Sequence, residues 1–202
     1  MIVDVLKAIR TRRSIKVFDP NYVLPASELE QLLAATTYCP TSYNLQNWRI
    51  VRVTDKGARR KIREVASNQA QVTDASELFV ICGDLKAWQK DPQRYWAEAS
   101  EERQHYVLPK IRDFYTGRAW MERDEVMRSG AIVGQTLMLA AKDLGLDSCP
   151  MIGFEQEAVA KIIKLPADHA LVMMLAVGKA AGPPRPRGSQ FGVDYFYREN
   201  HF

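Results

Sequence analysis

The sequence lacks any apolar run of about 18 residues, which is the length that a membrane-spanning helix requires. Its first ten residues, MIVDVLKAIR, carry Asp4 and Lys7 within an apolar pattern, unlike the basic-then-apolar order of a signal peptide. Internal repeats and low-complexity linkers are also absent. We therefore expect a single cytoplasmic domain over residues 1–202 that has no membrane partner.

Motifs for nucleotides and metals are missing as well. Neither GxGxxG nor GxxxxGK followed by Ser or Thr occurs, so no motif supports a Rossmann or P-loop site. Cys39, Cys82 and Cys149 lie far apart and form no CxxC pair, so the spacing of metal ligands is not met. Cys82 and Cys149 stand in apolar runs, where a small buried side chain is favoured over a nucleophile. We expect no metal site.

Charge is nearly balanced, with 28 basic and 24 acidic residues, but the basic ones gather in two clusters. The first is RTRRSIK at residues 10–16, and the second is PPRPRG at 183–188. Taken alone, the first cluster could be a nucleic-acid arm, a membrane-surface patch, a solvated helix end or a phosphate pocket. An arginine-rich helix, a helix-turn-helix pattern and an RNP-like strand are lacking, so nucleic-acid binding has the least support.

Mixed helical and strand patterns predict an α+β fold. The order Ser27 to Glu30 is that of a capping box and predicts Ser27 as a helix N-cap, while Asp55 is placed to cap the next helix. Helices are expected near 3–11, 27–36, 56–65 and 155–165, strands at 48–54, 77–84 and 169–179, and a strand or extended turn at 149–154.

Three segments have other patterns. Residues 86–128 are charged and aromatic and predict either a helical excursion over a binding site or plain surface helices. Residues 129–148 are apolar nearly all round, which is typical of a helix in a core or a subunit interface, and Gly130 and Gly134 would let another backbone approach. The tail 183–202 is Pro/Gly-rich and then aromatic, which favours packing against another surface.

Five short pieces follow one another along nearly the whole chain. Together, in this order, they resemble the FMN-dependent nitroreductase family. The pieces are RRSIKVF (12–18), CPTSYNLQNWRIV (39–51), SNQAQVTDAS (67–76), PMIGF (150–154) and GPPRPRGSQF (182–191).

The resemblance implies an α+β fold with a mixed, mostly antiparallel sheet flanked by helices. It implies an intertwined homodimer with two FMN sites at the interface, in which the tail 183–202 packs on the partner subunit. The implied activity is two-electron transfer, in ping-pong order, from NADH or NADPH through FMN to a small-molecule acceptor such as a nitroaromatic or a quinone.

The resemblance also assigns the phosphate end of the cofactor. Arg12, Arg185 and Arg187 match arginines on the FMN phosphate, where a guanidinium can bind two oxygens at once. Ser14 matches a serine on the phosphate and ribityl side. The two basic clusters would then form one clamp, although they are some 170 residues apart in the sequence.

At the ring end, Arg13 and Lys16 fall where the family contacts the pyrimidine edge of the flavin. A cation there stabilises negative charge on the reduced ring. Asn68 and Gln71 match a pair at the pyrimidine and ribityl region, and their spacing puts them on one face if that stretch is helical. Amides suit this edge because they both donate and accept.

Two further stretches complete the implied site. Many family members carry Glu where this chain has Ile152, and an apolar residue there favours apolar substrates. No side chain is assigned as catalytic acid or base, because the flavin carries the chemistry. The loop lent across the dimer contains Pro40, Thr41, Ser42 and Asn44, and the stretch beside the flavin contains Pro150, Met151, Ile152 and Gly153, whose N–H would reach flavin N5.

A flavin-binding sensor or carrier without turnover would use the same residues. Anaerobic addition of NADH or NADPH separates the two functions, because only an oxidoreductase bleaches its flavin.

Overall fold

A four-stranded antiparallel sheet forms the centre of the fold. The computed structural model describes residues 5–202, and its strands run in the order β1–β2–β4–β3. One row across the sheet is Val51, Val80, Met174 and Met151, each opposite the next. The strands are β1 (Trp48–Arg52), β2 (Glu77–Asp84), β3 (Asp147–Met151) and β4 (His169–Gly178).

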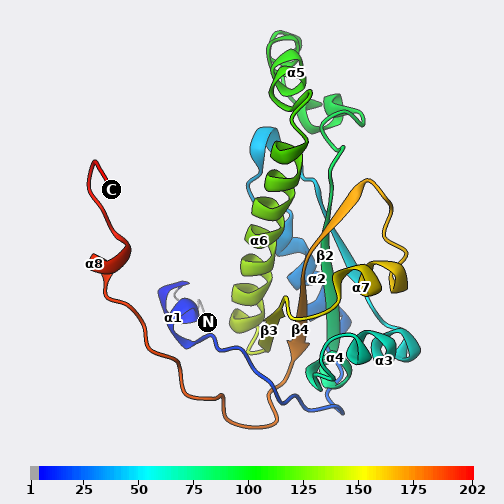
Figure 1. Cartoon of the computed structure of the whole chain (residues 1–202), viewed down its shortest axis with the longest axis vertical. Helices are drawn as coiled ribbons and strands as arrows, with labels where there is room; N and C mark the ends of the chain where they lie inside the picture. The colour runs from blue at the N-terminus through cyan, green and yellow to red at the C-terminus, as the bar shows by residue number, and fades with distance from the viewer. Residues whose placement is uncertain (1–4) are drawn as a thin grey trace.

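Helices cover both faces of this sheet (Figure 1). Both faces are therefore buried, and the central strands read as continuous apolar runs. One face is covered by α3 (Lys56–Glu64), α4 (Gln71–Asp74) and α7 (Gln156–Ile162), and the other by α2 (Ala26–Thr36) and α6 (Ala119–Asp143).

Strand β2 shows how the sequence builds two cores. Its side chains alternate between the faces, as the period of two requires. Leu78 and Val80 join the core under α3, α4 and α7, whereas Phe79 and Ile81 join the core under α2 and α6. The fold is α+β, as the sequence predicts. Among residues 5–202, parallel pairing is confined to the isolated bridge between Ser14 and Ser148.

The long helix α6 packs unusually close to the sheet because it presents glycines to it. A Cβ on Gly130 would lie 2.6 Å from Val172 Cγ2, and one on Gly134 would lie 2.9 Å from Met173 Sδ. Close approach at these glycines was predicted, but side chains of β4 make it rather than another backbone.

Residues 86–128 are mostly helical, as predicted, and share a small core with the loop before β1. Leu45, Ile111 and Tyr115 are buried there, and Trp88 stacks on Tyr115 with centroids 5.9 Å apart. The elements are η2 (Pro92–Trp96), α5 (Glu101–Tyr115) and the first turns of α6. The predicted boundary at residue 129 is wrong, because α6 runs unbroken from Ala119 to Asp143.

Helix capping gives one correction and one confirmation. The capping-box prediction is wrong: Ser27 lies inside α2, the N-cap is Pro25, and its carbonyl accepts from the N–H groups of Glu28 and Leu29. Asp55 does cap α3, since its carboxylate accepts from the Ala58 N–H at 2.7 Å.

Both ends of the described chain lie away from the sheet. Helix α1 (Val5–Thr11) covers the described part of the predicted helix 3–11, because residues 3 and 4 lie outside the described range. After β4 the tail passes α1, forms the short helix α8 (Val193–Phe196) and continues to the C-terminus (Figure 1). Among residues 5–202, no helix combines the length and apolarity needed to cross a membrane.

Candidate cofactor site

The two basic clusters meet in space. Arg187 Nη2 donates to the carbonyl oxygens of Arg10 and Arg12, at 3.1 and 3.0 Å. Arg13 Nη2 donates to the carbonyl oxygen of Arg185. The structure therefore brings Arg12, Arg185 and Arg187 together. It uses the Arg13 guanidinium to hold the tail, so the pyrimidine-edge role of Arg13 stays a prediction.

Arg12 carries a buried donor that the protein does not satisfy. Its Nη1 has no hydrogen-bond partner among residues 5–202, and the same is true of the buried Ser148 Oγ. Ser148 lies beside Ser14 through the parallel bridge, and its carbonyl accepts from the Ile15 N–H at 3.0 Å. A buried, unpaired guanidinium nitrogen is costly. An anionic ligand such as a phosphate would supply the missing acceptor, so these residues fit the phosphate end of FMN.

The thiol of Cys149 reports the electrostatics of this region. Burial raises its pKa, and the Lys16 ammonium, the Gln71 amide and the Arg12 guanidinium offset part of that rise. Burial also raises the pKa of Cys82 to about 12. Both thiols are thus held neutral near pH 7, which agrees with the prediction that they are buried apolar side chains rather than nucleophiles.

A group of amides lies next to Lys16. Gln69 Oε1 accepts from Lys16 Nζ at 3.4 Å and from Gln71 Nε2 at 2.8 Å. Gln69 Nε2 donates to the Gly153 carbonyl at 3.1 Å. Lys16, Gln71 and Gly153, all predicted site residues, are therefore joined through a residue that the prediction did not include.

Asn68 lies apart from this group. It precedes α4 and has a φ of 51°, so it does not share a helix face with Gln71. Its Oδ1 accepts from Arg63 Nε at 2.8 Å, and Gln71 is buried while Asn68 is exposed. The predicted pairing of Asn68 with Gln71 is not made.

The end of β3 presents a bare backbone. Pro150 and Met151 lie in β3, Ile152 is 72% exposed, and a Cβ on Gly153 would meet nothing within 4 Å. The Gly153 N–H donates to no group among residues 5–202. This N–H is available to an acceptor, as the predicted contact with flavin N5 requires.

The loop holding Pro40, Thr41, Ser42 and Asn44 lies at the opposite end of α6 from α1 and the basic clusters (Figure 1). It contains η1 (Ser42–Asn44), whose Ser42 N–H donates to the buried Glu125 Oε1 at 3.1 Å. Asn44 Nδ2 donates to the Tyr95 carbonyl at 3.2 Å. Within one chain, the predicted cofactor residues thus form two separate groups.

A cavity of about 840 Å³ lies elsewhere, between residues 20–24, the end of β1 and α3. Its lining is basic, but the arginines are largely engaged within the protein. Arg52 forms two 2.7 Å hydrogen bonds with Glu77, and Arg59 donates to three backbone carbonyls, which lie 2.6–3.0 Å away. Asn68 is the sole predicted site residue in its lining. Arg12, whose buried Nη1 lacks a partner among residues 5–202, does not line this cavity.

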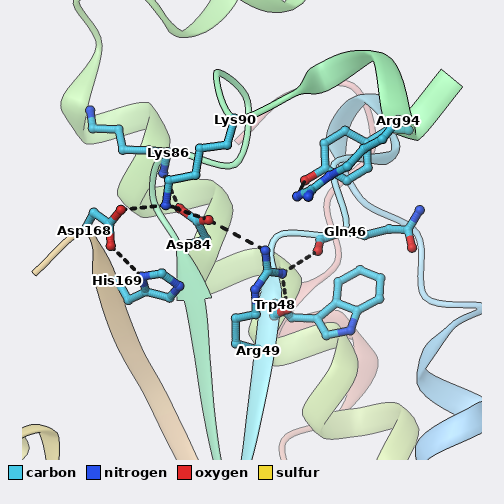
Figure 2. A network of polar contacts seen from close by, with 10 residues as sticks. Gln46, Trp48, Arg49, Asp84, Lys86, Lys90, Arg94, Asp168 and His169 are labelled. Atoms are coloured by element: carbon cyan, nitrogen blue, oxygen red, sulfur yellow. Dashed lines mark hydrogen bonds and ion pairs between the residues drawn. The ribbon is translucent and has the colours of Figure 1, made fainter. Parts of the chain in front are cut away.

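An ion-pair network fastens the segment after β2 (Figure 2). Lys90 Nζ lies 3.0 Å from Asp84 Oδ2 and 2.5 Å from Asp168 Oδ2, and Arg49 lies 3.6 Å from Asp84. His169 Nδ1 lies 2.7 Å from Asp168 Oδ1. The hydrogen bond from Lys90, followed by that from His169, lowers the pKa of Asp168 to about 2. Lys90 and Arg49 already balance the two carboxylates, so the network is a structural tether.

A model of the nitroreductase family matches residues 9–179. The chain belongs to the nitroreductase family. DrgA of Synechocystis sp. is 48% identical over 176 residues, which cover 87% of this chain and 84% of that protein. An oxygen-insensitive NADPH nitroreductase of Helicobacter pylori is 28% identical over 192 residues, which cover 91% of this chain and 90% of that protein. A protein of Exiguobacterium sibiricum, solved in complex with FMN, superposes with a TM-score of 0.90 at 25% identity and covers 99% of both chains.

Sequence reasoning about this nitroreductase-family chain missed two polar residues. Gln69 lies inside the piece SNQAQVTDAS. A helical spacing pairs Asn68 with Gln71, which are three residues apart, and leaves Gln69 out of the pair. The run of three amides in five residues was the available signal. Ser148 gave no signal, because a serine next to Cys149 in an apolar strand is ordinary.

Proposed function

We propose that this protein is an FMN-dependent NAD(P)H oxidoreductase that reduces nitroaromatics, quinones or related small acceptors. The observation that carries the proposal is the buried, unpaired Arg12 Nη1 at the junction of the two basic clusters. The relatives support it, since one is named an NADPH nitroreductase and another was solved with FMN. Such an enzyme would draw on cytoplasmic NADH or NADPH.

The residues at the junction would hold the phosphate. Arg12, with help from Arg185 and Arg187, would bind its oxygens, and Ser14 would donate to the phosphate or ribityl side. Arg13 and Arg187 hold the tail against residues 10–13 through backbone carbonyls, so the two basic clusters would already lie together when the ligand arrives. Such preorganisation lowers the ordering cost of binding.

The ring would lie beside Lys16, Gln71 and Gly153. When bound, FMN would supply the two-electron transfer between the nicotinamide donor and the acceptor. Lys16 would stabilise negative charge on the pyrimidine edge, and the free Gly153 N–H would donate to the ring. Ile152, which is exposed beside this place, would favour apolar acceptors.

The proposal includes a homodimer. The loop of Pro40, Thr41, Ser42 and Asn44 lies at the opposite end of α6 from α1 and the basic clusters, so it would serve the site of a second copy (Figure 1). Exposed apolar side chains are available for that contact on α1, on α6 and on the tail. They include Val5, Ile9, Ile132, Phe191, Phe196 and Tyr197.

Anaerobic titration tests the proposed activity. The protein loaded with FMN should lose its visible flavin absorbance when NADH or NADPH is added, and recover it with a quinone or a nitroaromatic. Tight FMN binding without bleaching by either nicotinamide would instead indicate a sensor or carrier. A protein that takes up no FMN would contradict the proposal.

A further inference from the structure

We propose that Gln69 is a positioning residue that fixes Lys16 and Gly153 around the cofactor and so sets its reduction potential. This inference rests on the proposed function. Gln69 contacts three site residues from three other places in the chain, namely Lys16 before the sheet, Gln71 at the start of α4 and Gly153 after β3.

The carboxamide of Gln69 has one orientation that satisfies all three contacts. Its Oε1 accepts from Lys16 Nζ and from Gln71 Nε2, while its Nε2 donates to the Gly153 carbonyl. A flipped amide would set its NH₂ group against two donors and its oxygen against a carbonyl. Gln71 is itself buried, so this partner of Gln69 is held in place.

Gly153 needs this restraint more than another residue would. It has no side chain, and a Cβ placed on it would touch nothing within 4 Å, so sterics leave its backbone free. The hydrogen bond from Gln69 holds the Gly153 carbonyl, beside a turn in which the Phe154 N–H donates to the Ile152 carbonyl at 3.1 Å.

A strained turn presents Gln69 to these partners. Ser67 and Asn68 both have left-handed backbones, with φ of 52° and 51°, which is costly for residues other than glycine. Arg63 holds the turn: its Nε donates to Asn68 Oδ1 at 2.8 Å, and its carbonyl accepts from the Asn68 N–H at 3.0 Å. Backbone strain of this kind persists only where the surrounding structure holds it, and it is concentrated at functional sites.

The electrostatic consequence runs through Lys16. A cation held at the pyrimidine edge favours reduced over oxidised FMN, and without its acceptor on Gln69 the ammonium is free to move into solvent. Gln69→Ala should therefore weaken binding of reduced FMN relative to oxidised FMN by about tenfold. A tenfold change corresponds to a fall of about 30 mV in a two-electron midpoint potential.

The experiment measures FMN dissociation constants and midpoint potentials for the full-length protein and its variants. Gln69→Glu keeps the size of the side chain but places a carboxylate against Lys16, so its potential should fall further than that of Gln69→Ala. This isosteric variant also serves if the alanine variant fails to fold. Gln31→Ala is the matched control, because Gln31 is an exposed glutamine on α2 that donates to the Ser27 carbonyl; its potential should equal that of the wild type.

A double variant shows whether Gln69 acts through Lys16. In a Lys16→Ala background, Gln69→Ala should shift the potential by clearly less than it does alone. Equal potentials for the wild type, Gln69→Ala and Gln69→Glu would overturn the positioning role while leaving the proposed function intact. Failure of the wild type to bind FMN would overturn the proposed function itself.

Discussion

At the scale of single residues, Arg12 lies where the two basic clusters, which are far apart in sequence, come together. Its guanidinium is held where one nitrogen is buried without an acceptor, and the tail arginine Arg187 binds the carbonyl next to it. A charge in this position destabilises the empty protein and favours a bound anion. The proposed phosphate would remove this cost by supplying the missing acceptor.

Removing this side chain should weaken FMN binding. Arg12→Ala is expected to cost about 1.5–3 kcal/mol of FMN binding free energy, which is typical of a hydrogen bond to a charged group. Fluorescence titration of the variant with FMN measures this. Arg10→Ala is the control, since Arg10 contributes its carbonyl rather than its exposed side chain to the cluster. Equal affinities of both variants and the wild type would refute the phosphate role of Arg12.

The grouping of the site residues was partly predictable, while their roles stay predictions. Lys16, Gln71 and Gly153 were named from the sequence, and the structure brings them into one group. The run of amides pointed to this stretch, but the link through Gln69 itself depends on a left-handed turn at Ser67 and Asn68 that carries no glycine. Non-glycine residues in that conformation are uncommon and leave no composition signal.

At the scale of elements, the packing of α6 on the sheet depends on small residues. Gly130→Ala would place a Cβ 2.6 Å from Val172 Cγ2, and the valine cannot easily rotate away. Overpacking costs about 1–3 kcal/mol, and the higher helix propensity of alanine returns up to about 1 kcal/mol. We expect a net loss in the free energy of unfolding, on the order of 1 kcal/mol, in urea denaturation at fixed protein concentration.

Gly188→Ala, in the tail, is the control for Gly130→Ala. A Cβ there meets nothing within 4 Å, so Gly188→Ala should leave the free energy of unfolding unchanged. A Gly130→Ala protein as stable as the wild type would show that the helix can move off the sheet without penalty.

The tether around Asp168 should give a pH-dependent contribution to stability. Its pKa is lowered from 3.8 to about 2, chiefly by the hydrogen bond from Lys90. A carboxylate with a depressed folded pKa stabilises the fold above its unfolded pKa and loses that contribution as the pH falls through the folded value. The stability difference between wild type and Asp168→Asn should therefore be present above about pH 4 and vanish toward pH 2. Thermal melts across this range measure it, and a constant difference would argue against the tether.

The ends of the helices were harder to predict from local sequence patterns than the helices themselves. The strands and most helices follow from apolar spacing, but α2 begins at Pro25 rather than Ser27. Pro25 has a fixed φ of −57° and an exposed carbonyl that accepts from two N–H groups, so the helix starts without a side-chain cap. Helix α6 continues through residue 129 because its packing against the sheet, rather than its own polarity, decides its length.

At the scale of the whole molecule, the two groups of predicted site residues lie far apart in one chain, and the proposed dimer would account for this. One chain holds α1 and the basic clusters beside it at one end of α6, and the loop between α2 and β1 at the other end (Figure 1). An isologous dimer would bring each loop to the site of the partner. Sequence alone could name both groups of residues, but their separation within one chain depends on the length of α6.

Sedimentation should show a particle of twice the 23.0 kDa chain mass. Ile132→Glu would place a charge on the outer face of α6, where burial of an unpaired carboxylate is costly, and should shift the equilibrium toward the single chain. Glu157→Gln is the control, because Glu157 is exposed on α7, which covers the opposite face of the sheet from α6. A wild-type protein that sediments as a single chain at all concentrations would contradict the dimer.

The most direct test of the account is a crystal structure of the protein grown with FMN. We expect the phosphate on Arg12 and the Arg185–Arg187 pair, the ring beside Lys16, Gln71 and Gly153, and Ser42 and Asn44 of a second copy at the same cofactor. An FMN bound in the cavity lined by Arg52 and Arg60, or no FMN at all, would contradict the assignment of the site.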